Sequence, residues 1–97
     1  GAIVVRRDVP TDTAHALQEA IRESLDHANA HPEDSRDYIR ACAQELSDEV
    51  TRAHIRTFVT EFSRDLGHAG RAAIERLVAS AAGKRDAALP ASGLFLA

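Results

Sequence analysis

The stretch SDEVTRAHIRTFVTEFSRDLGHAGRAAIERLV, from Ser47 to Val78, decides how this chain is expected to fold. It contains two runs in which apolar residues recur at the three- and four-residue intervals of one helical face. The first stripe consists of Thr51, Ile55, Phe58, Val59 and Phe62; the second consists of Gly70, Ala73, Ile74, Leu77, Val78 and Ala81. We therefore expect two paired helices whose stripes face each other, joined by a short turn at residues 65–67.

Two glycines fit this arrangement. Gly67 has the conformational freedom that a tight turn requires, and Gly70 lacks a side chain where two helices are expected to approach closely. Ser47 is a good N-cap for the first helix of the pair.

Composition narrows the class of protein. A chain of 97 residues forms at most one domain, and 44% hydrophobic with 28% charged residues is typical of a globular protein. The net charge is −3 and no long basic run is present, so we expect no nucleic-acid partner. No apolar run is long enough to span a membrane and no signal peptide is evident, so we expect a cytoplasmic protein without membrane contact. Cys42 is the single cysteine and is expected to be a buried, inert thiol.

The whole chain predicts a mainly α fold, with about four helices and one N-terminal strand. We treat residues 1–97 as a single segment, with a strand at residues 2–7 and a tail at 83–97. Helices are expected at about 13–30, 33–46, 48–63 and 68–82, from their apolar periodicity and their capping residues. In the first helix, Glu19, Glu23 and Asp26 lie off the apolar stripe and are expected to be solvated.

The N-terminal strand lacks an obvious neighbour. Residues 2–5, Ala-Ile-Val-Val, are apolar on both faces, which is typical of a strand buried inside a sheet. Such a strand needs partners for its backbone N–H and C=O groups. One source of these backbone partners is the tail segment Leu94–Leu96 or a second copy of the chain. Pairing with a second copy would be self-association. We favour partners in sequence outside these 97 residues, because lone strands covered by helices are rare.

No catalytic constellation is visible. His27 and His31 have the i,i+4 spacing of a helical metal site, but no carboxylate or third histidine is at a helpful spacing, so we expect a solvent-facing pair and no metal. His54 adjoins the apolar stripe and is expected to be partly buried. The serines have no Gly-x-Ser-x-Gly setting, and Gly67-x-x-Gly70 lacks the lysine of a phosphate loop. We therefore expect no catalytic residue and no cofactor in this chain.

A series of short segments gives the chain a family resemblance. These segments are GAIVVRRD at residues 1–8, AHPED at 30–34, AQELSDEV at 43–50, AH at 53–54, FS at 62–63, DLG at 65–67, GRAAIERL at 70–77 and LF at 94–95. Taken in this order, they resemble the C-terminal part of the 1,4-dihydroxy-6-naphthoate synthases, a family of the futalosine route to menaquinone.

The resemblance implies a fold and an activity. Such synthases resemble type II periplasmic binding proteins, with two α/β domains around a cleft. They are lyases that convert cyclic dehypoxanthine futalosine, a small-molecule substrate, to 1,4-dihydroxy-6-naphthoate. Their base and most substrate contacts are expected outside this chain, so the fragment alone is expected to be inactive. The substrate-binding residues remain unassigned, and Gly1–Ile3 is the segment nearest the expected cleft.

Three alternatives remain open. The sister enzyme chorismate dehydratase has a similar scaffold. A stand-alone helical interaction module would have to satisfy its strand internally or by self-association. A solute-binding relative involved in transport would share the scaffold without the chemistry.

Overall fold

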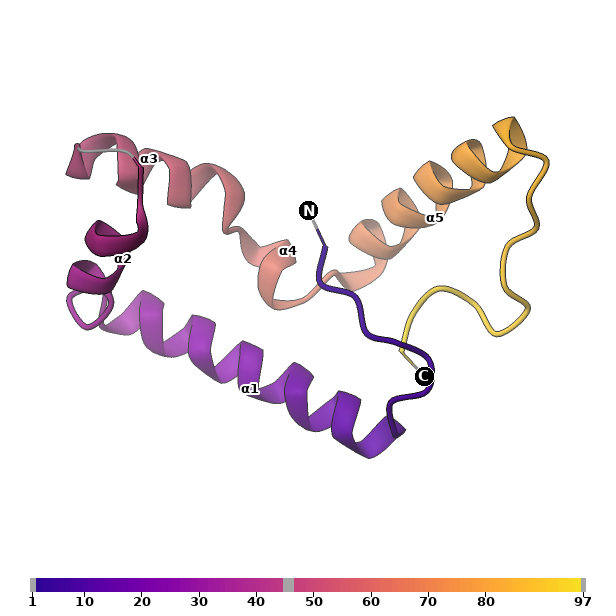
Figure 1. The fold of residues 1–97 in the computed structure, drawn as a ribbon, viewed down its shortest axis with the longest axis horizontal. Helices are drawn as coiled ribbons and strands as arrows, with labels where there is room; N and C mark the ends of the chain where they lie inside the picture. Colours follow the sequence, from indigo (N-terminus) through magenta and orange to yellow (C-terminus); the bar gives the residue numbers. More distant parts are fainter. Residues whose placement is uncertain (1, 45–46, 97) are drawn as a thin grey trace.

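The computed structural model describes residues 2–44 and 47–96. Within them the chain is mainly helical, as the sequence predicts, and contains no strand. The five helices are α1 (Thr11–Ala30), α2 (Arg36–Cys42), α3 (Asp48–Phe58), α4 (Glu61–Arg64) and α5 (Gly67–Lys84). Helix α1 runs from the N-terminal segment to α2, α3 turns back towards the middle of the molecule, and α4 leads from there into α5 (Figure 1). The result is an open arc with α2 and α3 at one end and α5 at the other.

Local sequence accounts for where the helices begin and end. Helix α1 ends at Ala30 because Pro32 disfavours a helical conformation at His31, whose φ is −131°. At the start of α3, the Ser47 hydroxyl accepts a hydrogen bond from the Val50 N–H at 3.4 Å, the N-cap that the sequence predicts.

The expected helix over residues 48–63 is divided in two. Val59 is extended, with φ −104° and ψ 96°, and separates α3 from the single turn α4. The Thr60 N–H donates to Ser63 Oγ at 3.1 Å, so Thr60 starts a new helix instead of continuing the old one. The structure likewise has α2 at Arg36–Cys42, where the sequence suggested 33–46; residues 45–46 of that range lie outside the described residues.

The turn between α4 and α5 has the geometry expected of Gly67. Its φ is +56°, the left-handed region that glycine occupies without cost, and its N–H donates to Asp65 Oδ1 at 2.8 Å. A side chain at Gly70 would meet Phe62 Cδ1 and Leu66 Cβ, each at 3.2 Å. Gly70 therefore allows close packing, but against α4 rather than against α3.

The expected pairing of the two apolar stripes is wrong. Phe58 is 66% exposed and Leu77 is 71% exposed, and α3 and α5 lie at opposite ends of the arc (Figure 1). The reason is local: the break at Val59 and the turn at Gly67 direct α5 away from α3. Cys42 is exposed as well, so the expectation of a buried thiol is also wrong.

The strand expected at residues 2–7 is not formed. Residues 2–6 have no regular secondary structure, and Ile3 and Val4 are 76% and 88% exposed. The segment has no neighbouring strand with which to pair, because the C-terminal tail contacts it through the side chain of Arg7 and not as a second strand. The Arg7 guanidinium donates to Ser92 Oγ and to the Gly93 carbonyl, each at 2.8 Å.

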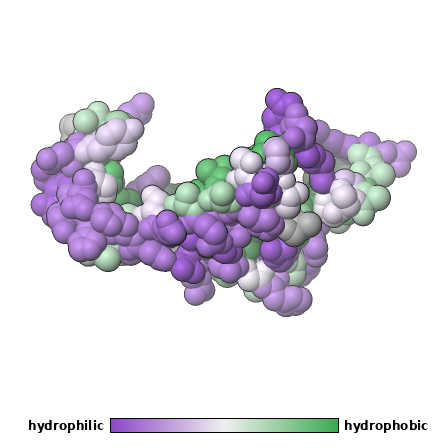
Figure 2. Space-filling model, turned by 90° about the horizontal axis from the view of Figure 1, so that it is seen from below, coloured by the Kyte–Doolittle hydropathy of each residue, from purple (hydrophilic) through white to green (hydrophobic). Residues whose placement is uncertain are grey.

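The described residues enclose almost no core. Ala14 is the one buried hydrophobic residue among them. The radius of gyration is 16.7 Å, whereas a compact domain of this length has about 12.5 Å. Hydrophobic residues gather instead in the hollow between the raised ends of the arc, and hydrophilic residues cover much of its outer side (Figure 2).

Candidate functional site

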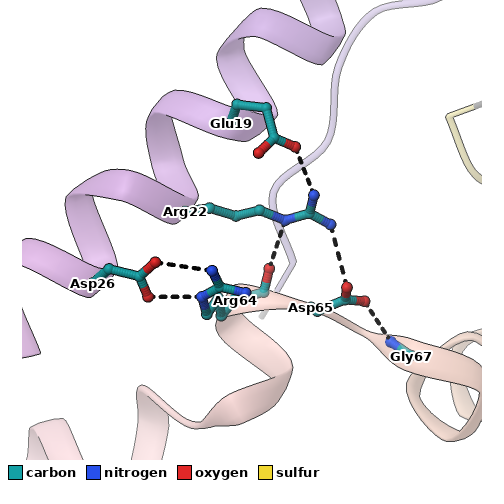
Figure 3. Close-up of polar contacts among 6 residues, drawn as sticks. All are labelled: Glu19, Arg22, Asp26, Arg64, Asp65 and Gly67. Carbon is teal, nitrogen blue, oxygen red and sulfur yellow. Dashed lines mark hydrogen bonds and ion pairs between the residues drawn. The ribbon is translucent and has the colours of Figure 1, made fainter.

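The main contact between elements distant in sequence joins α1 to α4 (Figure 3). The Arg64 guanidinium donates to both carboxylate oxygens of Asp26, from Nε at 2.7 Å and from Nη2 at 2.9 Å. This two-pronged pairing fixes orientation as well as distance, because the planar fork of an arginine matches a carboxylate. Asp26, which the sequence predicts to be solvated, is the acceptor of both hydrogen bonds.

Arg22, one turn before Asp26 on α1, completes this junction. Its guanidinium donates to the Arg64 carbonyl at 3.2 Å, to Glu19 at 2.6 Å and to Asp65 at 3.4 Å. Asp65 in turn accepts the Gly67 N–H, so one arginine ties α1 to the turn that starts α5 (Figure 3). We call these six residues, Glu19, Arg22, Asp26, Arg64, Asp65 and Gly67, the α1–α4 junction.

The contacts of the junction favour the charged form of its carboxyl groups. The hydrogen bond from Arg64 holds the pKa of Asp26 below its ordinary value. The Gly67 N–H, followed by the charge of Arg22, lowers the pKa of Asp65. Both carboxyls are therefore ionised at neutral pH and are poor proton donors. Since Asp26 and Arg64 are each about half exposed, we assign the pair a positioning role rather than a large stabilising one.

A hollow of about 410 Å³ lies beside the junction. The N-terminal segment contributes Ala2, Ile3 and Val5 to its lining, and α1 contributes Leu17 and Ile21. The segment Gly1–Ile3, singled out from the resemblance, thus borders this hollow through Ala2 and Ile3, while Gly1 lies outside the described residues.

The opposite wall of the hollow combines apolar and basic groups. Phe62 and Leu66 line it together with Arg64 and Arg71, while Arg22 lines the hollow from α1. The Arg71 guanidinium lies 4.8 Å from the ring centroid of Phe95, which helps to fix the returning tail. The hollow is therefore mainly apolar with three arginines, Arg22, Arg64 and Arg71, a surface suited to packing or to an anionic group and lacking an evident nucleophile among the described residues.

A second groove, of about 520 Å³, lies between α1, α2 and α3. Its lining includes Leu25 from α1, Ile39 from α2, and Ile55 from α3, with Val59 just beyond α3. We call it the three-helix groove.

Two histidines at the end of α1 lie beside carboxylates. The rings of His27 and His31 lie 4.9 Å apart, and both side chains are exposed, as expected. His27 Nε2 is 2.8 Å from Asp34, and His31 Nδ1 is 3.5 Å from Glu33. Sequence reasoning missed these carboxylates, because the turn after Pro32 brings them back over the helix end. No group of three or more residues able to hold a metal ion occurs among the described residues.

His54 contacts the ring of Phe58 at a centroid distance of 4.5 Å and is exposed, so its expected partial burial is wrong. In the parts of the chain that the structure describes, no helix combines the length and the apolar character needed to cross a bilayer.

Comparison with known proteins identifies the family. The profile of a family described as menaquinone biosynthesis matches residues 1–83. The chain is 49% identical over 96 residues to a 1,4-dihydroxy-6-naphthoate synthase of Thermus thermophilus, which covers 99% of the chain and 35% of that protein. It is 40% identical over 93 residues to the enzyme of the same name from Streptomyces coelicolor, covering 96% of the chain and 32% of that protein.

The chain thus spans about a third of the length of the curated relatives that it matches. No solved structure matches it significantly. Since the profile covers most of the chain and two synthases align with nearly all of it, the chain belongs to the menaquinone biosynthesis family.

Proposed function

We propose that this chain is the C-terminal part of a 1,4-dihydroxy-6-naphthoate synthase, a cytoplasmic lyase of the futalosine route. The observation that carries the proposal is the alignment of 96 of its residues, at 49% identity, with a synthase. In this role the enzyme would convert cyclic dehypoxanthine futalosine to 1,4-dihydroxy-6-naphthoate.

The contribution of the chain to this reaction is structural. The carboxyls of the α1–α4 junction are held ionised by arginine or backbone N–H groups, and the five histidines are exposed. We therefore assign the catalytic base and most substrate contacts to the other two thirds of the enzyme. Ala2 and Ile3 are the residues that we place nearest to the substrate cleft, because they border the hollow beside the junction.

We also propose that residues 2–7 become a strand in the complete enzyme, within the sheet of a periplasmic-binding-protein-like fold. Ile3 and Val4 would point to opposite faces of this strand, both are apolar, and both are exposed in the isolated chain. A neighbouring strand would satisfy the backbone and cover the side chains. When that strand is missing, the same segment is available for self-association.

The test of the function is a chimera. The matched 96 residues of the Thermus thermophilus synthase are replaced by this chain, and formation of 1,4-dihydroxy-6-naphthoate is measured. We expect turnover by the chimera and none by the 97-residue chain alone or by the Thermus enzyme lacking this third. A folded chimera without turnover would contradict the proposal.

Chorismate dehydratase is the second candidate, and a parallel chimera separates the two. The same chain is placed into a dehydratase scaffold, and consumption of chorismate is measured. We expect an active synthase chimera and an inactive dehydratase chimera. The reverse result would assign the chain to the sister enzyme.

A further inference from the structure

The chain exposes more surface than a self-contained domain of its size. Its accessible surface is 8226 Å², whereas a folded monomer of 10.5 kDa has about 5,400 Å². The excess of about 2,800 Å² is several times the roughly 800 Å² that one partner contributes to a standard protein interface. An excess of this size is typical of a subunit or segment taken out of a larger obligate structure.

The three-helix groove is the most defined part of this surface. Its floor is apolar: Leu25 and Ile39 are half-buried, and Ile55 and Val59 are 38% and 42% exposed. Three helices converge on it, so an inserted segment would contact side chains from all of them. Covering this floor would remove apolar area that water now contacts.

The rim of the groove is basic. Among the described residues, four arginines line it, Arg36 and Arg40 from α2 and Arg52 and Arg56 from α3, and Asp48 is the one acidic residue. Asp48 is already paired, since Arg40 Nε donates to it at 3.0 Å. The chain as a whole carries −3, so this positive rim is a local feature and not a reflection of net charge.

We propose that the three-helix groove is the docking surface for the remainder of the synthase polypeptide, and that the docked segment carries apolar side chains flanked by carboxylates. This inference rests on the proposed function. The occupant follows from two observations: the matched relatives have about two thirds of their length outside the alignment, and an arginine rim around an apolar floor complements an apolar segment with acidic edges.

The experiment uses the full-length Thermus chimera and measures its melting temperature. Ile55→Asp places a charge on the groove floor, and Arg52→Glu reverses one charge of the rim. Their matched controls are Val50→Asp on the same helix and Arg85→Glu beyond α5, which are exposed and do not line the groove. Far-UV circular dichroism of each isolated variant chain checks that its helices still form.

We expect Ile55→Asp and Arg52→Glu each to lower the melting temperature by at least about 5 °C, and the controls to change it by at most about 2 °C. The effect of Arg52→Glu should shrink in high salt, because screening weakens repulsion between charges. Equal shifts for groove and control variants would overturn the proposal, and so would a chimera that does not fold.

Other outcomes separate the docking surface from the function. A stable chimera without turnover, in which the groove variants still lower the melting temperature, would sink the function and leave the docking surface standing. Full turnover by the chimera, with no effect of the groove variants on the melting temperature, would support the function and rule out the docking surface. If the isolated chain sediments as a dimer that Ile55→Asp disrupts and Val50→Asp does not, the occupant is a second copy and the proposal fails.

Discussion

The turn at Gly67 allows a prediction whose magnitude follows from one backbone angle. Gly67 has φ +56°, and a Cβ placed on it would meet no heavy atom within 4 Å. Replacing it with alanine therefore adds no clash, and its whole cost is that of a left-handed conformation, about 1–2 kcal/mol. This free energy lowers the population of the turn by a factor of roughly 5–30.

The assay reads the turn directly. Phe62 lies against Gly70 only when the turn is formed, since a Cβ on Gly70 would be 3.2 Å from Phe62 Cδ1. We expect the nuclear Overhauser effect between the Phe62 ring and the Gly70 α-protons to be lost in Gly67→Ala. In Gly67→Asn it should be partly retained, because asparagine tolerates this region better than alanine.

The control is Gly83→Ala, at a glycine inside α5 with open space around it and no positive φ. Alanine there should favour the helix by up to about 1 kcal/mol and leave the signal between Phe62 and Gly70 unchanged. An undiminished signal in Gly67→Ala, or equal losses for alanine and asparagine, would refute the reasoning from the backbone angle.

Two further predictions concern charge and exposure. The pKa values of Asp26 and Asp65 are lowered below the ordinary 3.8, so their contribution to stability is complete well above pH 3.8 and is lost as the pH falls through 3.8 toward the folded values. Acidification should therefore raise the radius of gyration above 16.7 Å in small-angle scattering. The variant Asp26→Asn should have the same effect at neutral pH. A constant radius would contradict a positioning role for the junction. Cys42 is exposed, so it should react with a thiol reagent equally fast with and without denaturant, whereas protection without denaturant would mean that it is buried.

Features set by neighbouring residues were predictable from the sequence. The mainly helical class follows from apolar periodicity, the N-cap of α3 from Ser47, and the tight turn from Gly67. Each depends on hydrogen bonds or dihedral angles within a few residues, which the local sequence determines. The break at Val59 was missed because an apolar stripe continues across it, although Thr60 carried a capping signal.

Features that need a distant partner were not predictable. Asp26 and Arg64 are 38 residues apart, and no periodicity connects them. The stripe through Phe58 predicts one half of a helix pair, but it identifies only a face that has to be covered, not the element that covers it. The same holds for Ile3 and Val4, whose pattern predicts a strand but supplies no neighbour.

Scanning calorimetry of the 97-residue chain tests most directly whether it is one part of a larger enzyme. With Ala14 as the one buried hydrophobic residue among those described, we expect no cooperative heat absorption from the chain alone, and a cooperative transition from the chimera that includes it. A self-contained domain of this length would unfold with an enthalpy of about 70 kcal/mol near 60 °C. A sharp transition of that size in the isolated chain would contradict the account.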